Sequence, residues 1–113
     1  MTISEFIKKL RSTPKEILFQ ETMSVIDAHY IFEKVSFTNG EVINEAGQNS
    51  GSCKLFSFAK LQNLTKEETL YCFGEHYQNV IEHPEGNDHQ NIRNFMKSGW
   101  EGISFNTSPL IEK

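Results

Sequence analysis

The sequence predicts an α+β fold, in which about five short helices pack with a small antiparallel hairpin or three-stranded sheet. Apolar residues recur at helical intervals in several segments of the chain. An Asn-Gly pair at residues 39 and 40 separates two short segments with apolar residues, which is typical of a hairpin. The length of 113 residues suits one domain spanning residues 1–113, large enough to bury a core.

Capping residues and apolar spacing predict the first two helices. Thr2 and Glu5 form a capping-box pair ahead of apolar residues at helical spacing, which predicts a helix over residues 2–11. Pro14 then starts a new turn, because proline fits the first position of a helix. Apolar residues at intervals of three and four from Phe19 onwards predict a second helix near residues 20–30.

The predicted hairpin centres on Asn39-Gly40, because this pair supplies the two positive φ angles of a type I′ turn. A two-residue loop at this position places Phe37 opposite Val42 on one face. Residues 47–52 then form a loop that contains two glycines. Alternating apolar residues at 103 and 105 predict a short third strand that joins the hairpin.

Three more helices are expected in the second half of the chain. Ser52 is a suitable N-cap for the first of them. Thr65 and Glu68 form a second capping-box pair, which opens a long helix to about residue 83. Asp88 is the expected N-cap of a last helix through residue 96, and Gly99 ends it.

Composition and charge argue against several classes of function. The net charge of −4 disfavours sequence-independent binding to nucleic acid or to an anionic membrane surface, because both need a basic face. No apolar run is long enough to span a bilayer, and the N-terminus lacks a hydrophobic signal core. A cytoplasmic protein is therefore expected, in which the only two cysteines, Cys53 and Cys72, are reduced and unpaired.

Cys53 is one candidate for chemistry. It falls in the first turn of a predicted helix, where backbone N–H groups favour a thiolate and lower the pKa of the thiol. His83 or His89 would complete a Cys–His pair. The alternative interpretation is a small residue packed under the start of the helix.

Metal binding is a second candidate. One side of the predicted long helix carries four candidate residues: Cys72, His76, Asn79 and His83. Of these, only Cys72 and His76 are close enough to bind one zinc ion together. The cluster of His83, Asp88 and His89 offers a metal site or an acid–base pair, with helix capping as the alternative. Neither spacing matches a known motif, so no metal or cofactor is assigned.

Recognition of a small polar ligand is the third candidate. The segment 39–53 is rich in amides and hydroxyls, and Arg93 is suited to bind an anion or to pair with Glu45. The alternative is a loop that satisfies its own backbone through Asx turns, with Trp100 in or over the core. The candidate ligand-binding residues are Asn44, Glu45, Asn49, Ser52, Cys53, His83, Asp88, His89, Asn91 and Arg93.

Three segments also carry a resemblance to a known family: FTNGEVINEAGQNSGSCKLFSFA, ETLYCFGEHY and HPEGNDHQNIRNFMKSGWEGI. Together they resemble the HopJ type III effector proteins, from the first helix to Phe105. The resemblance implies a small stand-alone α+β domain, in a family named after a plant-pathogen protein assigned to type III secretion. It brings no catalytic residues. The polar positions that match are Asn39, Asn44, Glu45, Gly47, Ser52, Cys53, His83, Asp88, His89, Asn91 and Arg93.

Three functional hypotheses follow. The resemblance implies an effector that is delivered into a host cell and binds a host protein. The polar segments predict instead a cytoplasmic domain that binds a small polar ligand, and Cys53 with a histidine predicts a Cys-dependent enzyme. The capped helix expected at residues 2–11 differs from the disordered leader of a secreted effector, and no separate leader is expected before it. The sequence predicts no particular oligomeric state.

Overall fold

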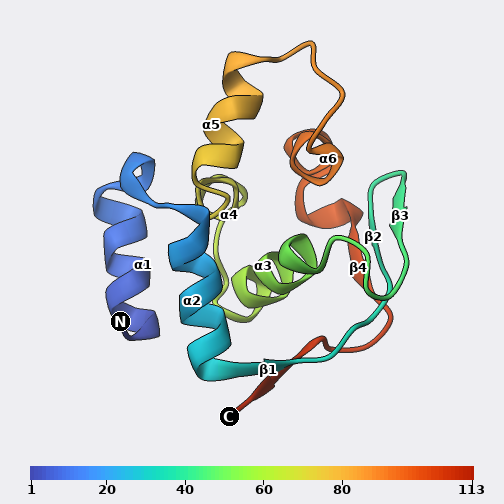
Figure 1. Ribbon diagram of the computed structural model, residues 1–113. Helices are drawn as coiled ribbons and strands as arrows, with labels where there is room; N and C mark the ends of the chain where they lie inside the picture. The colour runs from blue at the N-terminus through green and yellow to red at the C-terminus, as the bar shows by residue number, and fades with distance from the viewer.

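The computed structural model describes residues 1–113 and confirms the α+β class, with six α-helices and two small antiparallel sheets. Helix α3 runs through the middle of the molecule, between α1 and α2 on one side and the three-stranded sheet on the other (Figure 1). In chain order the elements are α1 (Ile3–Ser12), η1 (Pro14–Glu16), α2 (Phe19–His29), β1 (Tyr30–Phe32), β2 (Phe37–Asn39), β3 (Val42–Asn44), α3 (Ser50–Leu61), α4 (Lys66–Tyr71), α5 (Glu75–Glu82), α6 (Gln90–Ser98), η2 (Gly99–Gly102), β4 (Ile103–Phe105) and β5 (Leu110–Glu112).

The core is built around the aromatic side chain of Phe56 on α3, which is fully buried. Its ring packs against Phe95 of α6 at a centroid distance of 4.9 Å and against Phe73 at 5.5 Å. Phe37 of β2 and Trp100 of η2 complete the cluster at 6.2 and 6.5 Å. One residue on the central helix therefore connects the sheet to α6, to η2 and to the segment between α4 and α5. Aromatic pairs of this kind stabilise beyond the area they bury.

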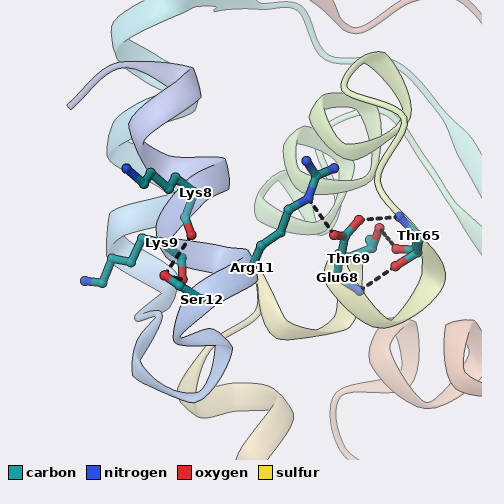
Figure 2. Close-up of polar contacts among 7 residues, drawn as sticks. All are labelled: Lys8, Lys9, Arg11, Ser12, Thr65, Glu68 and Thr69. Atoms are coloured by element: carbon teal, nitrogen blue, oxygen red, sulfur yellow. Dashed lines mark hydrogen bonds and ion pairs between the residues drawn. The ribbon is translucent and has the colours of Figure 1, made fainter.

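Both predicted capping boxes are present, and the second one is tied to α1. Arg11 donates from Nε to Glu68 Oε2 at 2.8 Å, as Figure 2 shows. The other oxygen of Glu68 accepts the Thr65 N–H at 2.9 Å, while Thr65 Oγ1 accepts the Glu68 N–H at 3.1 Å. Glu68 therefore satisfies the start of α4 and joins it to the end of α1.

The long helix expected over residues 65–83 is wrong, because the chain breaks between α4 and α5 at Gly74. Gly74 has φ 59° and ψ −128°, outside the helical region. A Cβ atom here would lie 2.5 Å from the backbone nitrogen of Phe19, so only glycine allows this close approach. Thr22 Oγ1 also donates to the Cys72 carbonyl at 2.8 Å, and Phe19 N–H donates to Glu75 Oε1 at 2.9 Å. Contacts with α2 therefore override the local helical pattern.

The hairpin exists, but its turn lies one residue later than expected, which moves the partner of Phe37 by two residues. Asn39 pairs with Val42, and Phe37 pairs with Asn44. The two-residue turn is Gly40-Glu41, with φ +60° at Gly40 and no positive φ at Asn39. Asn39 is instead the last residue of β2, fully buried, because its side chain donates two hydrogen bonds to Asn91. The expected third strand, β4, does pair with β2.

The second sheet was not expected from the sequence. The apolar spacing predicts Tyr30 at the end of a helix, but Tyr30 opens β1, which pairs with the C-terminal strand β5. Ile31 and Ile111 face each other across this ribbon and both are exposed. Three-residue strands that follow a helix directly carry too few alternating positions to be recognised. No helix in the structure is both long enough and apolar enough to cross a membrane.

The expected N-caps of α3 and α6 are also wrong. Helix α3 begins at Ser50 and is preceded by Asn49 at φ 51° and ψ 46°, so Ser52 lies inside its first turn. Helix α6 begins at Gln90 and is preceded by His89 at φ 49° and ψ 48°, and not by Asp88. Both preceding residues are left-handed, whereas an N-cap is ordinarily extended. Neither helix has a side chain that caps its N-terminus.

Candidate ligand-binding site

The two uncapped helix starts face the same cleft. This cleft has a volume of about 490 Å³ and lies between the start of α3, the start of α6, the beginning of α5 and strand β3. We call it the α3–α6 cleft. Its lining residues are Phe19, Val42, Asn49, Gly51, Ser52, Phe73, His76, His89, Gln90, Asn91 and Ile92. None of them is an acid, a lysine or an arginine, so recognition here relies on amides, a hydroxyl, imidazoles and the backbone.

Backbone N–H groups are free at both helix starts. The first N–H of α3 to find an acceptor is that of Cys53, and the first in α6 is that of Ile92. The N–H groups before them have no acceptor in the protein, and four of these belong to lining residues: Gly51, Ser52, Gln90 and Asn91. The positive ends of two helix dipoles therefore meet at the cleft, and such ends attract hydrogen-bond acceptors and anions.

A cluster of hydrogen-bonded asparagine side chains lies at the base of the cleft. Asn44 and Asn91 exchange hydrogen bonds, Nδ2 to Oδ1, at 3.2 and 3.0 Å. Asn39 donates to the Asn91 carbonyl at 2.7 Å and to its Oδ1 at 3.0 Å, and Asn49 donates to Asn44 Oδ1 at 2.6 Å. Asn39 Oδ1 is buried and has no partner. The network fixes the hairpin, the start of α3 and the start of α6 relative to one another.

Two imidazoles stand side by side at the cleft. The ring centroids of His76 on α5 and His89 before α6 are 5.3 Å apart, at an interplanar angle of 38°. The His76 ring also meets Phe19 edge to face at 4.9 Å. Neither imidazole makes a hydrogen bond to the protein, whereas the rings of His29 and His83 each lie within hydrogen-bond distance of a backbone carbonyl.

The structure brings together four of the ten residues expected to bind a ligand. These four line the cleft: Asn49, Ser52, His89 and Asn91. Asn44 lies directly behind them, in the amide network. The other five lie outside the cleft: Glu45, Cys53, His83, Asp88 and Arg93. The side chain of Gln48 accepts the backbone N–H of Glu45 at 3.1 Å, so a glutamine, and not an expected Asx turn, satisfies this part of the loop.

Cys53 does not have the properties expected of a nucleophile. Its side chain is 1% exposed, and burial raises its pKa to about 11 instead of lowering it. The α3 dipole does not offset this desolvation of the thiolate. Cys72 is fully buried in the core, and burial raises the pKa of its thiol, so its side chain is not accessible to a zinc ion shared with His76. Both cysteines are unpaired, as expected.

Arg93 pairs with Asp88 and not with Glu45. Arg93 Nη2 donates to Asp88 Oδ1 at 2.7 Å, and Nε donates to the Asp88 carbonyl at 2.6 Å. The guanidinium holds the pKa of the Asp88 carboxyl below its usual range. His83 Nδ1 lies 3.0 Å from the Asn79 carbonyl, at the end of its own helix. These contacts stabilise the 83–89 loop, which positions His89 at the cleft.

Several lining residues could not be recognised from the sequence. His76 stood out only as a partner for Cys72, because one continuous helix would have placed both on one stripe. The break at Gly74 changes the direction in which His76 points. Phe19, Val42, Phe73 and Ile92 supply an apolar wall and looked like ordinary core positions. No group of three or more His, Cys, Asp or Glu side chains is gathered to hold a metal ion.

Comparison with known proteins places the chain in a family. The model of the HopJ type III effector proteins matches residues 3–110. The crystal structure of VPA0580, described as a protein of unknown function, superposes with a TM-score of 0.98 at 53% identity, covering 100% of this chain and 95% of that chain. No curated protein matches. The chain belongs to the HopJ type III effector protein family.

Proposed function

We propose that the protein binds a small polar ligand in the α3–α6 cleft. The observation that carries the proposal is that two polar sequence segments, 39–53 and 83–93, meet at one concave site. Each segment contains a left-handed residue, Asn49 or His89, directly before a helix whose N-terminus is uncapped. Helix starts are normally satisfied by a side chain, by water or by a ligand.

The cleft has the size and composition of a small-molecule site. Its volume of about 490 Å³ lies within the usual range for ligand pockets. An apolar wall that includes Phe19 and Phe73 faces a polar side made of amides, a hydroxyl and backbone N–H groups. The backbone N–H groups on this side have no acceptor in the protein, so the proposed ligand presents acceptor oxygens and one apolar face.

Native mass spectrometry of protein purified from its own cells tests this proposal. We expect an additional mass that is lost on denaturation, and its value identifies the compound. The variants Ser52→Ala and Gln90→Ala remove polar side chains from the cleft and should reduce the occupied fraction. Glu45→Ala and Asn87→Ala, which change exposed residues outside the cleft, should retain it.

A contrary outcome is also well defined. A protein that carries no additional mass, and that no compound in a metabolite library stabilises against heat, does not use the cleft for a small ligand. Retention of the same mass in Ser52→Ala and Gln90→Ala would place the ligand elsewhere.

The family match supports a second candidate function, secretion through a type III system followed by binding to a host protein. Fusion of the chain to a reporter enzyme that is active only in host cytosol tests this directly. Reporter activity that depends on an intact secretion apparatus supports the effector role. Equal activity with and without the apparatus contradicts it. The two candidates are compatible, because a delivered protein can also bind a ligand.

A further inference from the structure

We infer that His76 and His89 form an open binding site for a divalent transition-metal ion in the α3–α6 cleft. The inference goes beyond the proposed small polar ligand and does not depend on it, since a metal ion alone can occupy this position. The two residues come from different elements, α5 and the loop before α6, and neither was paired with the other by the sequence pattern.

The separation of the rings suits one shared ion. An imidazole nitrogen binds zinc at about 2.0–2.1 Å, and the ring centre lies roughly 1 Å beyond it, so two rings on a tetrahedral ion have centres about 5 Å apart. The observed centroid distance is 5.3 Å. Since χ2 of histidine has a broad energy minimum, modest rotation can bring one nitrogen of each ring to a common point.

Both imidazoles are available as ligands. Neither donates to or accepts from any protein group, so no hydrogen bond has to break when a metal ion binds. Phe19 packs edge to face on His76 at 4.9 Å and holds that ring at the cleft. The left-handed backbone of His89 is uncommon for a residue other than glycine, and conformations of this kind cluster at functional sites.

The residues around the two imidazoles indicate which kind of metal site they form. No third His, Cys, Asp or Glu joins the pair, so this is not a closed structural zinc site. The side-chain oxygens of Asn49 and Ser52 line the same cleft, and water or a small anion attracted by the two helix N-termini can fill the remaining positions. Imidazole ligands suit zinc, nickel and copper better than magnesium or calcium, so the expected ion belongs to the first group.

Titration with Zn²⁺ or Ni²⁺ alone tests the inference, using EDTA-treated protein without a histidine tag. We expect saturable one-to-one binding with a Kd below about 1 mM. His76→Gln and His89→Asn should each weaken it by at least about tenfold, because even the loss of a residue that only orients a metal ligand costs that much. Asparagine at position 89 is chosen because it tolerates the left-handed backbone. His29→Gln and His83→Gln are the matched controls and should bind as the wild type does.

Two further readouts keep the test decisive. Imidazole NMR signals of His76 and His89 in the wild-type protein should shift on addition of Zn²⁺ while those of His29 and His83 do not, and this holds even if a variant fails to fold. Co²⁺ should bind without a thiolate charge-transfer band, since both cysteines are buried. Absence of saturable binding, or shifts at His29 and His83 alone, would overturn the inference. Neither result bears on whether an organic ligand occupies the cleft.

Discussion

Single asparagine side chains hold the site together. Asn39, Asn44 and Asn91 are all buried, and each depends on another for its hydrogen bonds. Buried polar groups of this kind stabilise when paired but are costly when a partner is removed. The composition of the chain showed that the segments were polar. It could not show which amides would be buried, because this depends on the register of the hairpin.

Replacement of Asn91 by alanine should therefore be destabilising. It would leave Asn44 Nδ2 without an acceptor and Asn39 Nδ2 with the Asn91 carbonyl alone. We expect a loss of about 1–3 kcal/mol in the free energy of unfolding, the usual cost of an unpaired buried polar group. Urea unfolding followed by circular dichroism measures this. Asn94→Ala on the same helix, whose side chain makes no hydrogen bond in the structure, is the control. Equal stability of the two variants would mean that the network contributes little.

Gly74 is the second residue on which the site depends. Gly74→Ala places a Cβ atom 2.5 Å from the Phe19 nitrogen, at a positive φ. The left-handed backbone alone costs about 1–2 kcal/mol, so the clash should make the total loss larger than that. Gly47→Ala is a matched control, because Gly47 also has a positive φ but its added Cβ would meet only Lys34 Cδ at 3.5 Å. In thermal unfolding, Gly74→Ala should have a melting temperature well below that of Gly47→Ala. The opposite order would contradict the close approach of Gly74 to the backbone of Phe19.

At the level of elements, the sequence signals with a local cause were reliable. The capping boxes at residues 2–5 and 65–68, the hairpin, the α6 helix and the third strand β4 all depend on neighbouring residues, and all are present. Two of the errors have a different cause. The break at Gly74 and the one-residue shift of the hairpin turn are imposed by contacts with α2 and α6 that lie far away in sequence.

The capping box of α4 predicts how stability depends on pH. The Thr65 N–H, and then Arg11, lower the pKa of Glu68 below its ordinary value of 4.5. A lowered pKa in the folded state means that this carboxylate stabilises the fold above about pH 4.5, and that the contribution is lost as the pH falls through the folded value. Glu68→Gln should show a smaller loss of melting temperature between about pH 6 and pH 3 than the wild type does.

A matched substitution separates this effect from general charge removal. Glu67→Gln changes a carboxylate on the same turn that makes no hydrogen bond in the structure, so its acid dependence should follow the wild type. An acid profile of Glu68→Gln that coincides with those of the wild type and Glu67→Gln would contradict the assignment. In addition, Thr65→Ala should cost about 1 kcal/mol at neutral pH, the usual effect of losing an N-cap.

For the molecule as a whole, burial decides which candidate residues remain accessible. Cys53 and Cys72 both lie in the hydrophobic core, with thiol pKa values raised by burial. The folded protein should react with a thiol reagent at pH 7 far more slowly than the urea-unfolded chain. Rapid labelling of Cys53 in the native state would contradict the structure and would restore a Cys-dependent activity as a hypothesis.

The overall arrangement explains why the sequence pointed to the site only in part. Asn49, Ser52, His89 and Asn91 lie in two polar segments that attract attention in the sequence. His76 and the apolar wall of Phe19, Val42, Phe73 and Ile92 come from other elements, and only the folded chain brings them to the same cleft. Arg93 and Asp88 stood out for their charge, yet they pair with each other and brace a loop.

A crystal structure of the protein purified from its own cells, without added ligands, tests the central claim most directly. The account predicts electron density for a small molecule in the α3–α6 cleft, with acceptor atoms within hydrogen-bond distance of the backbone N–H groups of Gly51, Ser52, Gln90 or Asn91. A cleft that contains only water, in crystals whose lattice leaves it open, would contradict the claim that the two polar segments form a ligand site.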